Sequence, residues 1–224
     1  YYLDYLLYLI IDFTQIGHFY PNNDKRIKLI NNGLTALNET KLSYGTILFG
    51  FPFKINYNNP KMMNTYGYFK YIYYIKLRID KTTGINQEIR NPLINDKIDV
   101  CDPVLGIGFI KHNINISKYT KPEQSNDSSV IYSDGTLYTR YNNRDNRDET
   151  SLTFGYISDT IYIEINYVSK NALIKVEHGK SKLIDLNKHK NNDIQLCFVL
   201  DSQKNDKHSN KYTTQITILD QHWK

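Results

Sequence analysis

Two carboxylates are the side chains of this sequence whose type and setting would suit catalysis. Asp134 lies in the Ser-Asp-Gly stretch at 133–135, and Asp159 directly follows Ser158. A pair of carboxyl groups on a β-sandwich can hydrolyse a glycosidic bond, one as the acid and the other as base or nucleophile. Asp is also favoured in turns, where its side chain accepts hydrogen bonds from the backbone. We therefore expect both residues to cap turns, and we predict no catalytic residue.

Other catalytic and metal-binding signatures are missing from the sequence. It contains no Gly-x-Ser-x-Gly elbow, no His-Glu-x-x-His motif and no Walker loop. Gly106 and Gly108 have Gly-x-Gly spacing, but they lie in an apolar run without the following helix that a phosphate site needs. Cys101 and Cys197 form no Cys/His cluster with zinc spacing. We predict a protein that is not an enzyme, with no cofactor, no metal and two free, buried thiols.

The charged residues predict a solvated surface more than a nucleic-acid site. The net charge is +5, but the 28 basic residues are interleaved with 23 acidic ones and form no basic stripe. Four histidines fall in polar loops, where we expect contact with solvent: His112, His178, His189 and His208. The abundance of Asn, Lys, Tyr and Ile is typical of an AT-rich genome, so most tyrosines need no functional explanation. A basic, aromatic domain that contacts nucleic acid is kept as an alternative.

Alternating hydrophobicity predicts strands through most of the chain. In 68–80 the odd positions are apolar and most even positions are polar, and the same alternation recurs at 160–167 and 213–218. The runs 104–110 and 194–200 are continuously apolar, which predicts central strands covered on both faces. Gly106 and Gly108 would allow a neighbouring strand to approach closely. About a dozen strands separated by polar turns predict an all-β antiparallel sandwich.

The first residues follow a different pattern. Apolar side chains recur at helical spacing through 1–12, which predicts a short N-terminal helical extension that docks on the domain or continues toward a partner. This run is shorter than the roughly 20 residues that span a bilayer, so we predict no membrane span. Residues 13–224 show no repeat and no break in composition, and they are predicted to form one domain. Because the chain begins with Tyr1, we expect a segment of a larger protein.

The order of these strands, with the residues at their ends, resembles the SPRY domain family. Residues 27–34 resemble its early strand and turn, 67–79 its aromatic "G-x-Y-Y-F-E-V" strand, and 105–109 the strand that follows. Residues 129–138 resemble the segment that ends in Asp-Gly, and 154–167 the "F-x-x-G-D-x-I-G" segment, with Ser158 and Asp159 in the Gly-Asp place. Residues 178–180, His-Gly-Lys, stand at the place of the family's Asn-Gly-Lys turn, and 196–200 and 216–219 resemble its last two strands. The sequence departs at Tyr162, where the family has Gly, in strand 171–176 and in an insertion at 81–102.

The resemblance spans about residues 13–223 and implies a fold and a function. The fold is a bent antiparallel β-sandwich of two sheets, a concanavalin-like jelly roll. The function is an interaction module, or adaptor, in a larger cytoplasmic or nuclear protein, which recognises another protein or a short peptide through loops at one end. Rigid scaffolds with variable loops and aromatic side chains suit such recognition. Seven residues are candidates for contact with the partner by position: Tyr119, Tyr132, Asp134, Tyr138, Arg140, Phe51 and Pro52.

Several alternatives stay open for these positions. Tyr138 and Arg140 would form a solvated strand face if no partner binds there, and Phe51 would belong to the core. Residues 142–149 are mixed in charge and are predicted to be a solvated loop, with an acidic peptide on Arg140, Arg144 and Arg147 as the alternative. A lectin-like carbohydrate-binding sandwich would need exposed rings on a concave sheet face, and Tyr74, Tyr138 and Tyr162 are candidates for them.

Overall fold

The computed structural model describes residues 17–19, 26–38, 45–54, 72–81, 105–112, 114, 122, 125, 127–141, 143–155, 158–166, 169–189, 193–200 and 214–223. Three sequence predictions therefore lie outside the described residues: the helix at 1–12, nearly all of the 81–102 insertion, and Tyr119. No helix among the described residues is long and apolar enough to cross a membrane.

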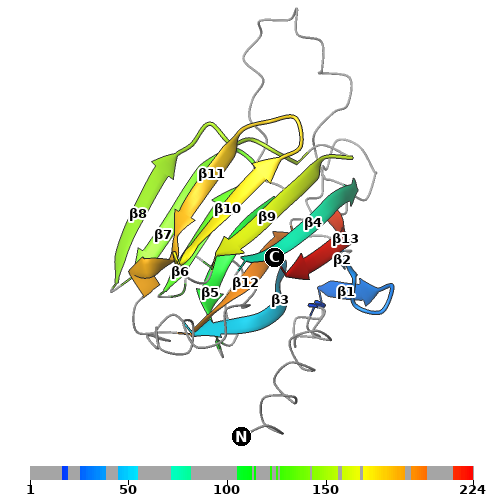
Figure 1. Cartoon of the computed structure of the whole chain (residues 1–224), viewed down its shortest axis with the longest axis horizontal. Coiled ribbons are helices and arrows are strands. Elements are labelled where there is room, and N and C mark those ends of the chain that lie inside the picture. The colour runs from blue at the N-terminus through cyan, green and yellow to red at the C-terminus, as the bar shows by residue number, and fades with distance from the viewer. Residues whose placement is uncertain are drawn as a thin grey trace, which may run out of the picture.

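The described residues form two antiparallel sheets that pack face to face (Figure 1). The seven-stranded sheet has the order β1 (Ile27–Ile30), β2 (Thr35–Asn38), β13 (Thr214–Trp223), β4 (Ile72–Lys81), β9 (Thr160–Asn166), β10 (Asn171–Val176) and β11 (Ser181–Asp185). The six-stranded sheet has the order β3 (Gly45–Lys54), β12 (Asp193–Leu200), β5 (Leu105–Lys111), β6 (Ser128–Tyr132), β7 (Thr136–Tyr141) and β8 (Arg144–Glu149). A short 3-10 helix, η4 (Leu186–His189), follows β11. The predicted all-β sandwich of two antiparallel sheets is confirmed.

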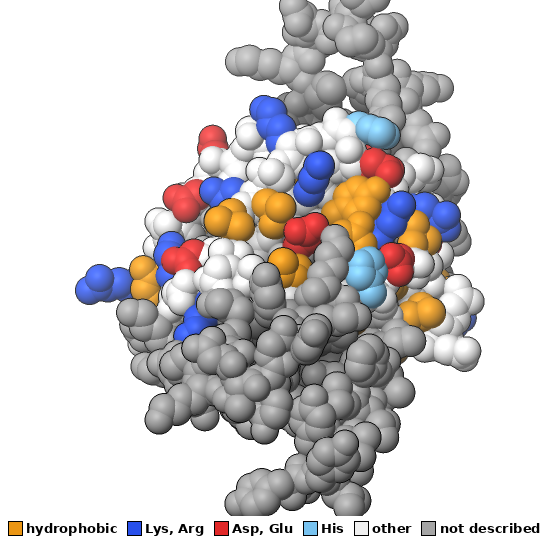
Figure 2. Space-filling model, in the orientation of Figure 1, with side chains coloured by type: hydrophobic (Ala, Val, Ile, Leu, Met, Phe, Trp, Pro, Cys, Tyr) orange, Lys and Arg blue, Asp and Glu red, His pale blue; other side chains and the backbone are white. Residues whose placement is uncertain are grey.

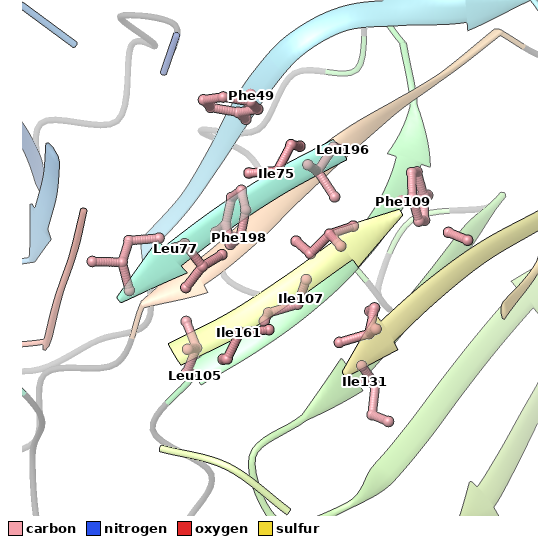
Figure 3. Packing of buried hydrophobic residues seen from close by; sticks show 14 of the residues in the cluster. Phe49, Ile75, Leu77, Leu105, Ile107, Phe109, Ile131, Ile161, Leu196 and Phe198 are labelled. Atoms are coloured by element: carbon pink, nitrogen blue, oxygen red, sulfur yellow. The ribbon is translucent and has the colours of Figure 1, made fainter. Parts of the chain in front are cut away.

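The core between the sheets explains the alternating pattern in the sequence. In β4, Tyr73, Ile75, Leu77 and Ile79 are at most 4% exposed, while the residues between them are partly or fully exposed. Ile75 and Leu77 lie near Ile107 and Phe198 of the opposite sheet in the close-up of the core (Figure 3). Apolar surface removed from water stabilises the fold by about 25 cal/mol per Å². Because one face of such a strand is buried, apolar residues are selected at every second position of its sequence.

The two continuously apolar runs form the central strands β5 and β12, as predicted. Their alternate residues belong to two separate clusters, because both faces of these strands are buried. One cluster is the inter-sheet core, which includes Ile107, Phe109, Leu196 and Phe198. The other lies on the outer side of the six-stranded sheet and contains Ile110, Val130, Tyr132, Cys197 and Val199. Burial on both faces leaves no position for the polar half of an alternating pattern.

Phe51 and Pro52, expected by position to lie just beyond an apolar strand, are instead part of strand β3. The backbone of both residues lies within β3, at the edge of the six-stranded sheet. Phe49 pairs with Leu196 and Phe53 with Ile194, so three β3 residues oppose Gln195 alone. This bulge begins at Gly50, whose φ is 65°. The irregular pairing removes the need for an N–H group at Pro52, which is why proline is tolerated here.

Gln195 fixes the bulge. Its side chain is 2% exposed, and its Nε2 donates a hydrogen bond to the Gly50 carbonyl at 2.8 Å. Its Oε1 lies 3.1 Å from Nδ1 of His112. Gln195→Ala should lower the free energy of unfolding by about 1–3 kcal/mol, because it leaves buried polar groups without a partner. Urea unfolding followed by tryptophan fluorescence measures this, and Ser151→Ala at an exposed position is the control. A loss equal to that of the control would contradict the assigned role.

The segment at 142–149 was predicted to be a loop, but residues 144–149 form strand β8. All six residues of β8 are exposed. It pairs with β7 only, with Tyr141 opposite Arg144 across the hairpin. Because neither face of this edge strand is buried, its sequence lacks the alternation by which strands are recognised.

Candidate functional site

The turns at one end of the sandwich are joined by backbone hydrogen bonds. Phe154 N–H donates to the Ser133 carbonyl at 3.1 Å, and Thr150 N–H donates to the Gly135 carbonyl at 2.8 Å. Farther along the chain, Glu177 N–H donates to the Thr160 carbonyl at 2.9 Å. Residues 133–135, 150–155, 158–159 and 177–180 therefore lie at the same end of the strands. We call these residues the turn end.

Asp134 and Asp159 cap turns at the turn end, as predicted. Asp134 Oδ1 accepts a hydrogen bond from the Thr136 N–H at 2.9 Å, and Asp159 Oδ2 accepts one from the Gly155 N–H at 3.0 Å. Each carboxylate therefore stabilises its own turn. Ser158 has a φ of 72°, a left-handed conformation that favours glycine. This conformation accounts for the glycine that the SPRY pattern has at this place.

The structure separates the contact residues that were predicted together around the 133–135 turn. Asp134 precedes β7, whereas Arg140 lies near the other end of the same strand. The four residue steps of extended strand from Thr136 to Arg140 alone span about 13 Å. Tyr132 is 1% exposed and belongs to the outer cluster of the six-stranded sheet, so its predicted role in binding a partner is wrong. Its ring fills the space beside Gly106 instead.

Tyr138 and Arg140 lie on the outer side of the six-stranded sheet. The ring of Tyr138 meets Tyr132 edge to face at 5.6 Å, and the guanidinium group of Arg147 lies 5.5 Å from the Tyr138 ring centroid. Arg140 Nε is 3.1 Å from the carboxylate of Asp145. Both arginines thus contact neighbours within the sheet, and an acidic side chain already meets one of them. In the described geometry, Arg140 and Arg147 therefore do not form a cluster of unopposed positive charge that would bind an acidic peptide.

The outer face of the seven-stranded sheet carries a group of three rings, of which Tyr74 and Tyr162 are partly exposed and His222 is exposed. Residues directly opposite one another on paired strands lie on the same face. Two rows across β11, β10, β9, β4 and β13 follow from the register. The first row is Leu183, Leu173, Glu164, Tyr74 and His222, and the second is Ser181, Lys175, Tyr162, Lys76 and Asp220. We call these ten residues the aromatic face. Of the residues between the two rows, Ile174, Ile163 and Ile75 belong to the core.

The side chains of the aromatic face contact one another. The Tyr74 ring centroid lies 6.0 Å from that of Tyr162 and 4.8 Å from that of His222. Lys76 Nζ is 5.3 Å from the centroid of Tyr162, within range of a cation–π contact. The Tyr162 hydroxyl donates a hydrogen bond of 2.6 Å to Glu177, which belongs to the turn end. The aromatic face and the turn end are therefore continuous.

The electrostatics of the aromatic face keep its phenols neutral. The hydrogen bond to Glu177 raises the pKa of Tyr162, and the same bond lowers the pKa of Glu177. Partial burial, followed by the nearby Tyr162, Asp220 and Glu164, raises the pKa of Tyr74. A neutral phenol at physiological pH is a hydrogen-bond donor with an apolar ring. These groups suit recognition of a surface, and their pKa values do not favour a nucleophile.

Two exposed leucines lie on this sheet. Leu183 is 54% exposed at the β11 edge of the aromatic face, and Leu219 is 44% exposed beside Asp220 in an irregular part of β13. Figure 2 shows hydrophobic side chains interspersed with basic, acidic and histidine side chains over this sheet. The sequence analysis grouped Tyr74 and Tyr162 correctly but added Tyr138, which lies on the other sheet. It missed His222, Lys76 and Leu183, because only the register of the strands brings them to the tyrosines.

A buried serine and histidine form the second notable polar contact. Ser129 Oγ lies 2.9 Å from Nε2 of His189, and both residues are 1% exposed. The prediction that His189 is solvated was wrong, because η4 turns its side chain under the sheet. A hydroxyl beside an imidazole is the arrangement of a nucleophile and its base. Here no substrate reaches either group, so the contact is structural. No group of three metal-ligating side chains occurs among the described residues.

Comparison with known proteins supports the fold. No family model matches the chain, and neither does any curated protein. Among solved structures, the SPRY domain of human HERC1 superposes with a TM-score of 0.51 at 13% identity, covering 90% of this chain and 97% of that one. The TRIM65 PSpry domain superposes with a TM-score of 0.51 at 10% identity, covering 91% and 92%. The chain has a SPRY-like fold.

The SPRY-like fold confirms the sequence resemblance at the level of architecture. The early strand of the resemblance is β1. Its turn contains Asn31, Asn32 and Gly33, which all have positive φ, and leads into β2. The segment at 178–180 is the turn between β10 and β11. The segment after Phe154 leads through Ser158 and Asp159 into β9. Identities of 10–13% establish the fold alone.

Proposed function

We propose that the SPRY-like domain is a non-enzymatic interaction module that binds a partner protein through the aromatic face and the adjoining turn end. The observation that carries this proposal is the surface cluster of the partly exposed Tyr74 and Tyr162 with the exposed His222, continuous with Glu177 of the turn end. The SPRY resemblance supports recognition of a protein through loops at one end of the sandwich. The four turn residues 177–180 are all exposed.

The composition of the aromatic face matches the anatomy of a protein interface. Such interfaces have a centre rich in Tyr, Trp and Arg and a polar rim with charges of both signs. Tyr74 and Tyr162 supply the centre, and Lys76, Lys175, Glu164 and Asp220 lie around them. A carbohydrate site would need a ring face open for stacking, whereas the Tyr162 ring has Lys76 over it and Tyr74 beside it. The acidic residues among the rings also disfavour a nucleic-acid backbone.

The residues predicted from the sequence supply a second candidate surface. Asp134 lies at the turn end, while Tyr138 and Arg140 lie on the opposite sheet, next to β8. If the partner binds there, it contacts the outer side of the six-stranded sheet instead of the aromatic face. The two surfaces each contain exposed aromatic and basic side chains, so substitutions in one serve as controls for the other.

The double variant Tyr74→Ala/Tyr162→Ala should weaken partner binding at least about 100-fold, because central aromatic residues cost about 2 kcal/mol or more each when truncated. Affinity capture from the native cell extract identifies the partner, and titration of the purified partner by calorimetry measures the loss. The matched control is Tyr138→Ala/Arg140→Ala. Circular dichroism verifies that both variants are folded.

The outcomes separate the alternatives. A partner lost with Tyr138→Ala/Arg140→Ala but retained by Tyr74→Ala/Tyr162→Ala would move the site to the six-stranded sheet. Binding to a glycan array, or to nucleic acid with a steep salt dependence, would replace the proposed function. A wild-type domain that retains no protein from the extract would also contradict it.

A further inference from the structure

Strand β8 presents a free edge with an unusual sequence. Among the described strands it is the terminal strand of the six-stranded sheet and pairs with β7 on one side only. All six of its residues are exposed, and the Asp145 side chain is 75% exposed. Figure 1 shows β8 at the outer margin of the sandwich. Its outward N–H and C=O groups are thus available to a further strand.

Five of the six residues of β8, 144–148, have charges arranged symmetrically with opposite sign, and Glu149 falls outside this pattern. The sequence Arg144-Asp145-Asn146-Arg147-Asp148 reads basic, acidic, neutral, basic, acidic. Reversal of this segment about Asn146 places every basic residue opposite an acidic one. An antiparallel strand of the same sequence is therefore its electrostatic complement. We propose that two copies of this chain associate by antiparallel pairing of β8 with β8, around a two-fold axis at Asn146.

The proposed register opposes five pairs of residues. Arg144 faces Asp148 of the second copy, Asp145 faces Arg147, and Asn146 faces its own counterpart; symmetry generates the other two pairs. Four ion pairs result, two on each face of the ribbon, because successive side chains point to opposite faces. Directly opposite charges of unlike sign stabilise a strand pair. The six-stranded sheets of the two copies then join into one continuous sheet.

Neighbouring registers are excluded on physical grounds. Outward-pointing backbone groups alternate along an edge strand, so pairing shifts by two residues at a time. One such shift places Asp145 opposite Asp145, and the shift in the other direction places Arg147 opposite Arg147. Like charges directly opposite are destabilising. One register out of three is thus complementary, which fixes the geometry of the dimer.

Charged side chains on an edge strand usually prevent its association with other strands, and β8 is such a strand. Charges on an edge block pairing with a generic strand, because few sequences neutralise them in register. The same charges favour a strand of complementary order, which the chain itself supplies. An isologous contact of this kind closes after two copies and does not grow into a fibre.

Sedimentation velocity of the whole 224-residue chain tests the proposal. An interface confined to one strand pair is small, so we measure from about 10 μM to about 1 mM, the range of weak and transient complexes. We expect a reversible monomer–dimer equilibrium with no larger species. A chain that stays monomeric over this range overturns the proposal.

Charge exchange tests the register. Asp145→Arg and Arg147→Asp should each weaken self-association at least about tenfold, because each sets like charges opposite one another. A mixture of the two variants should form a heterodimer, and the double variant should regain the homodimer, because both restore opposite charges. Misfolding of a single variant would not be rescued in this way. A dimer that survives Asp145→Arg, or a mixture that stays monomeric, overturns the proposal.

Cysteine cross-linking tests the axis. Asn146→Cys places a thiol opposite its own counterpart, at a separation that a disulfide bridges. Under mild oxidation it should give a covalent dimer, whereas Asp148→Cys, which faces Arg144 of the second copy, should not. Equal cross-linking of both variants, or none with Asn146→Cys, contradicts the two-fold axis at Asn146.

Discussion

Gly108→Ala should destabilise the protein by about 3 kcal/mol, at the upper end for an overpacked core. A Cβ atom at this position would lie 2.0 Å from the Ser129 carbonyl oxygen and 2.5 Å from Val130 Cα, both on the neighbouring strand β6. These are backbone atoms of a central strand pair, so relief requires β5 and β6 to move apart. That movement would break ladder hydrogen bonds and open the core between the sheets.

The matched control lies two residues earlier in the same strand. A Cβ atom at Gly106 would meet side-chain atoms of Tyr132 at 2.9 Å and Val130 at 3.1 Å. Side chains adjust more easily than a paired backbone, so Gly106→Ala should cost less than Gly108→Ala. Both substitutions raise strand propensity equally, so the difference isolates the backbone contact. Urea unfolding midpoints measure it, and equal losses for the two variants would show that β5 and β6 separate freely.

The second large effect concerns acid and His189. Burial lowers the pKa of His189, outweighing the nearby carboxylates of Asp127 and Asp185, which raise it. Nδ1 has no hydrogen-bond partner among the described residues, so no hydrogen bond from this nitrogen offsets the cost of burying the charged form. The unfolded chain takes up a proton near the ordinary histidine pKa of about 6.5, before the folded protein does. Stability is therefore complete above that pH and falls as the pH drops from there toward the lower folded-state pKa.

One proton of difference changes stability by about 1.4 kcal/mol per pH unit within this window. His189→Gln should remove that slope while it retains a polar group beside Ser129. Urea unfolding at intervals from about pH 7 to pH 5 measures both proteins in the window of histidine titration. The control His178→Gln, at an exposed turn position, should keep the wild-type slope. An unchanged slope in His189→Gln would mean that His189 takes up its proton over the same pH range in the folded and the unfolded chain, which would contradict the prediction.

Asp80 acts in a separate pH window. Burial alone would raise its pKa, but hydrogen bonds from Thr217, Arg78 and Gln215 outweigh burial and lower it. A lowered carboxylate pKa gives stability that is present above the ordinary value of about 4 and is lost below it. Acid unfolding below that pH should therefore persist in His189→Gln. The two contributions are distinguished by the pH at which each appears.

The sequence by itself determined the secondary structure of strands in which one face or both faces are buried. Alternation in 68–80 predicted β4, because a strand with one buried face selects apolar residues at every second position. The unbroken apolar run with Gly108 predicted a central strand with a close neighbour. The structure confirms it, because a Cβ atom at Gly108 would lie only 2.0 Å from the Ser129 carbonyl oxygen. Asp134 and Asp159 were assigned to turns, because a short carboxylate favours its own backbone.

The tertiary structure decided which residues share a surface. The register of five strands, which is set by pairs far apart in the chain, places Tyr74 and Tyr162 beside His222 and removes Tyr138 to the other sheet. His189 and β8 are two further cases in which the local sequence did not reveal the structure. His189 lies in a polar segment that was predicted to be solvated, yet η4 buries it beneath β6. Strand β8 has no alternating pattern in its sequence, because neither of its faces is buried. The local sequence pattern indicates which face of a strand is buried. Packing between segments that are distant in the chain determines which residues lie next to one another.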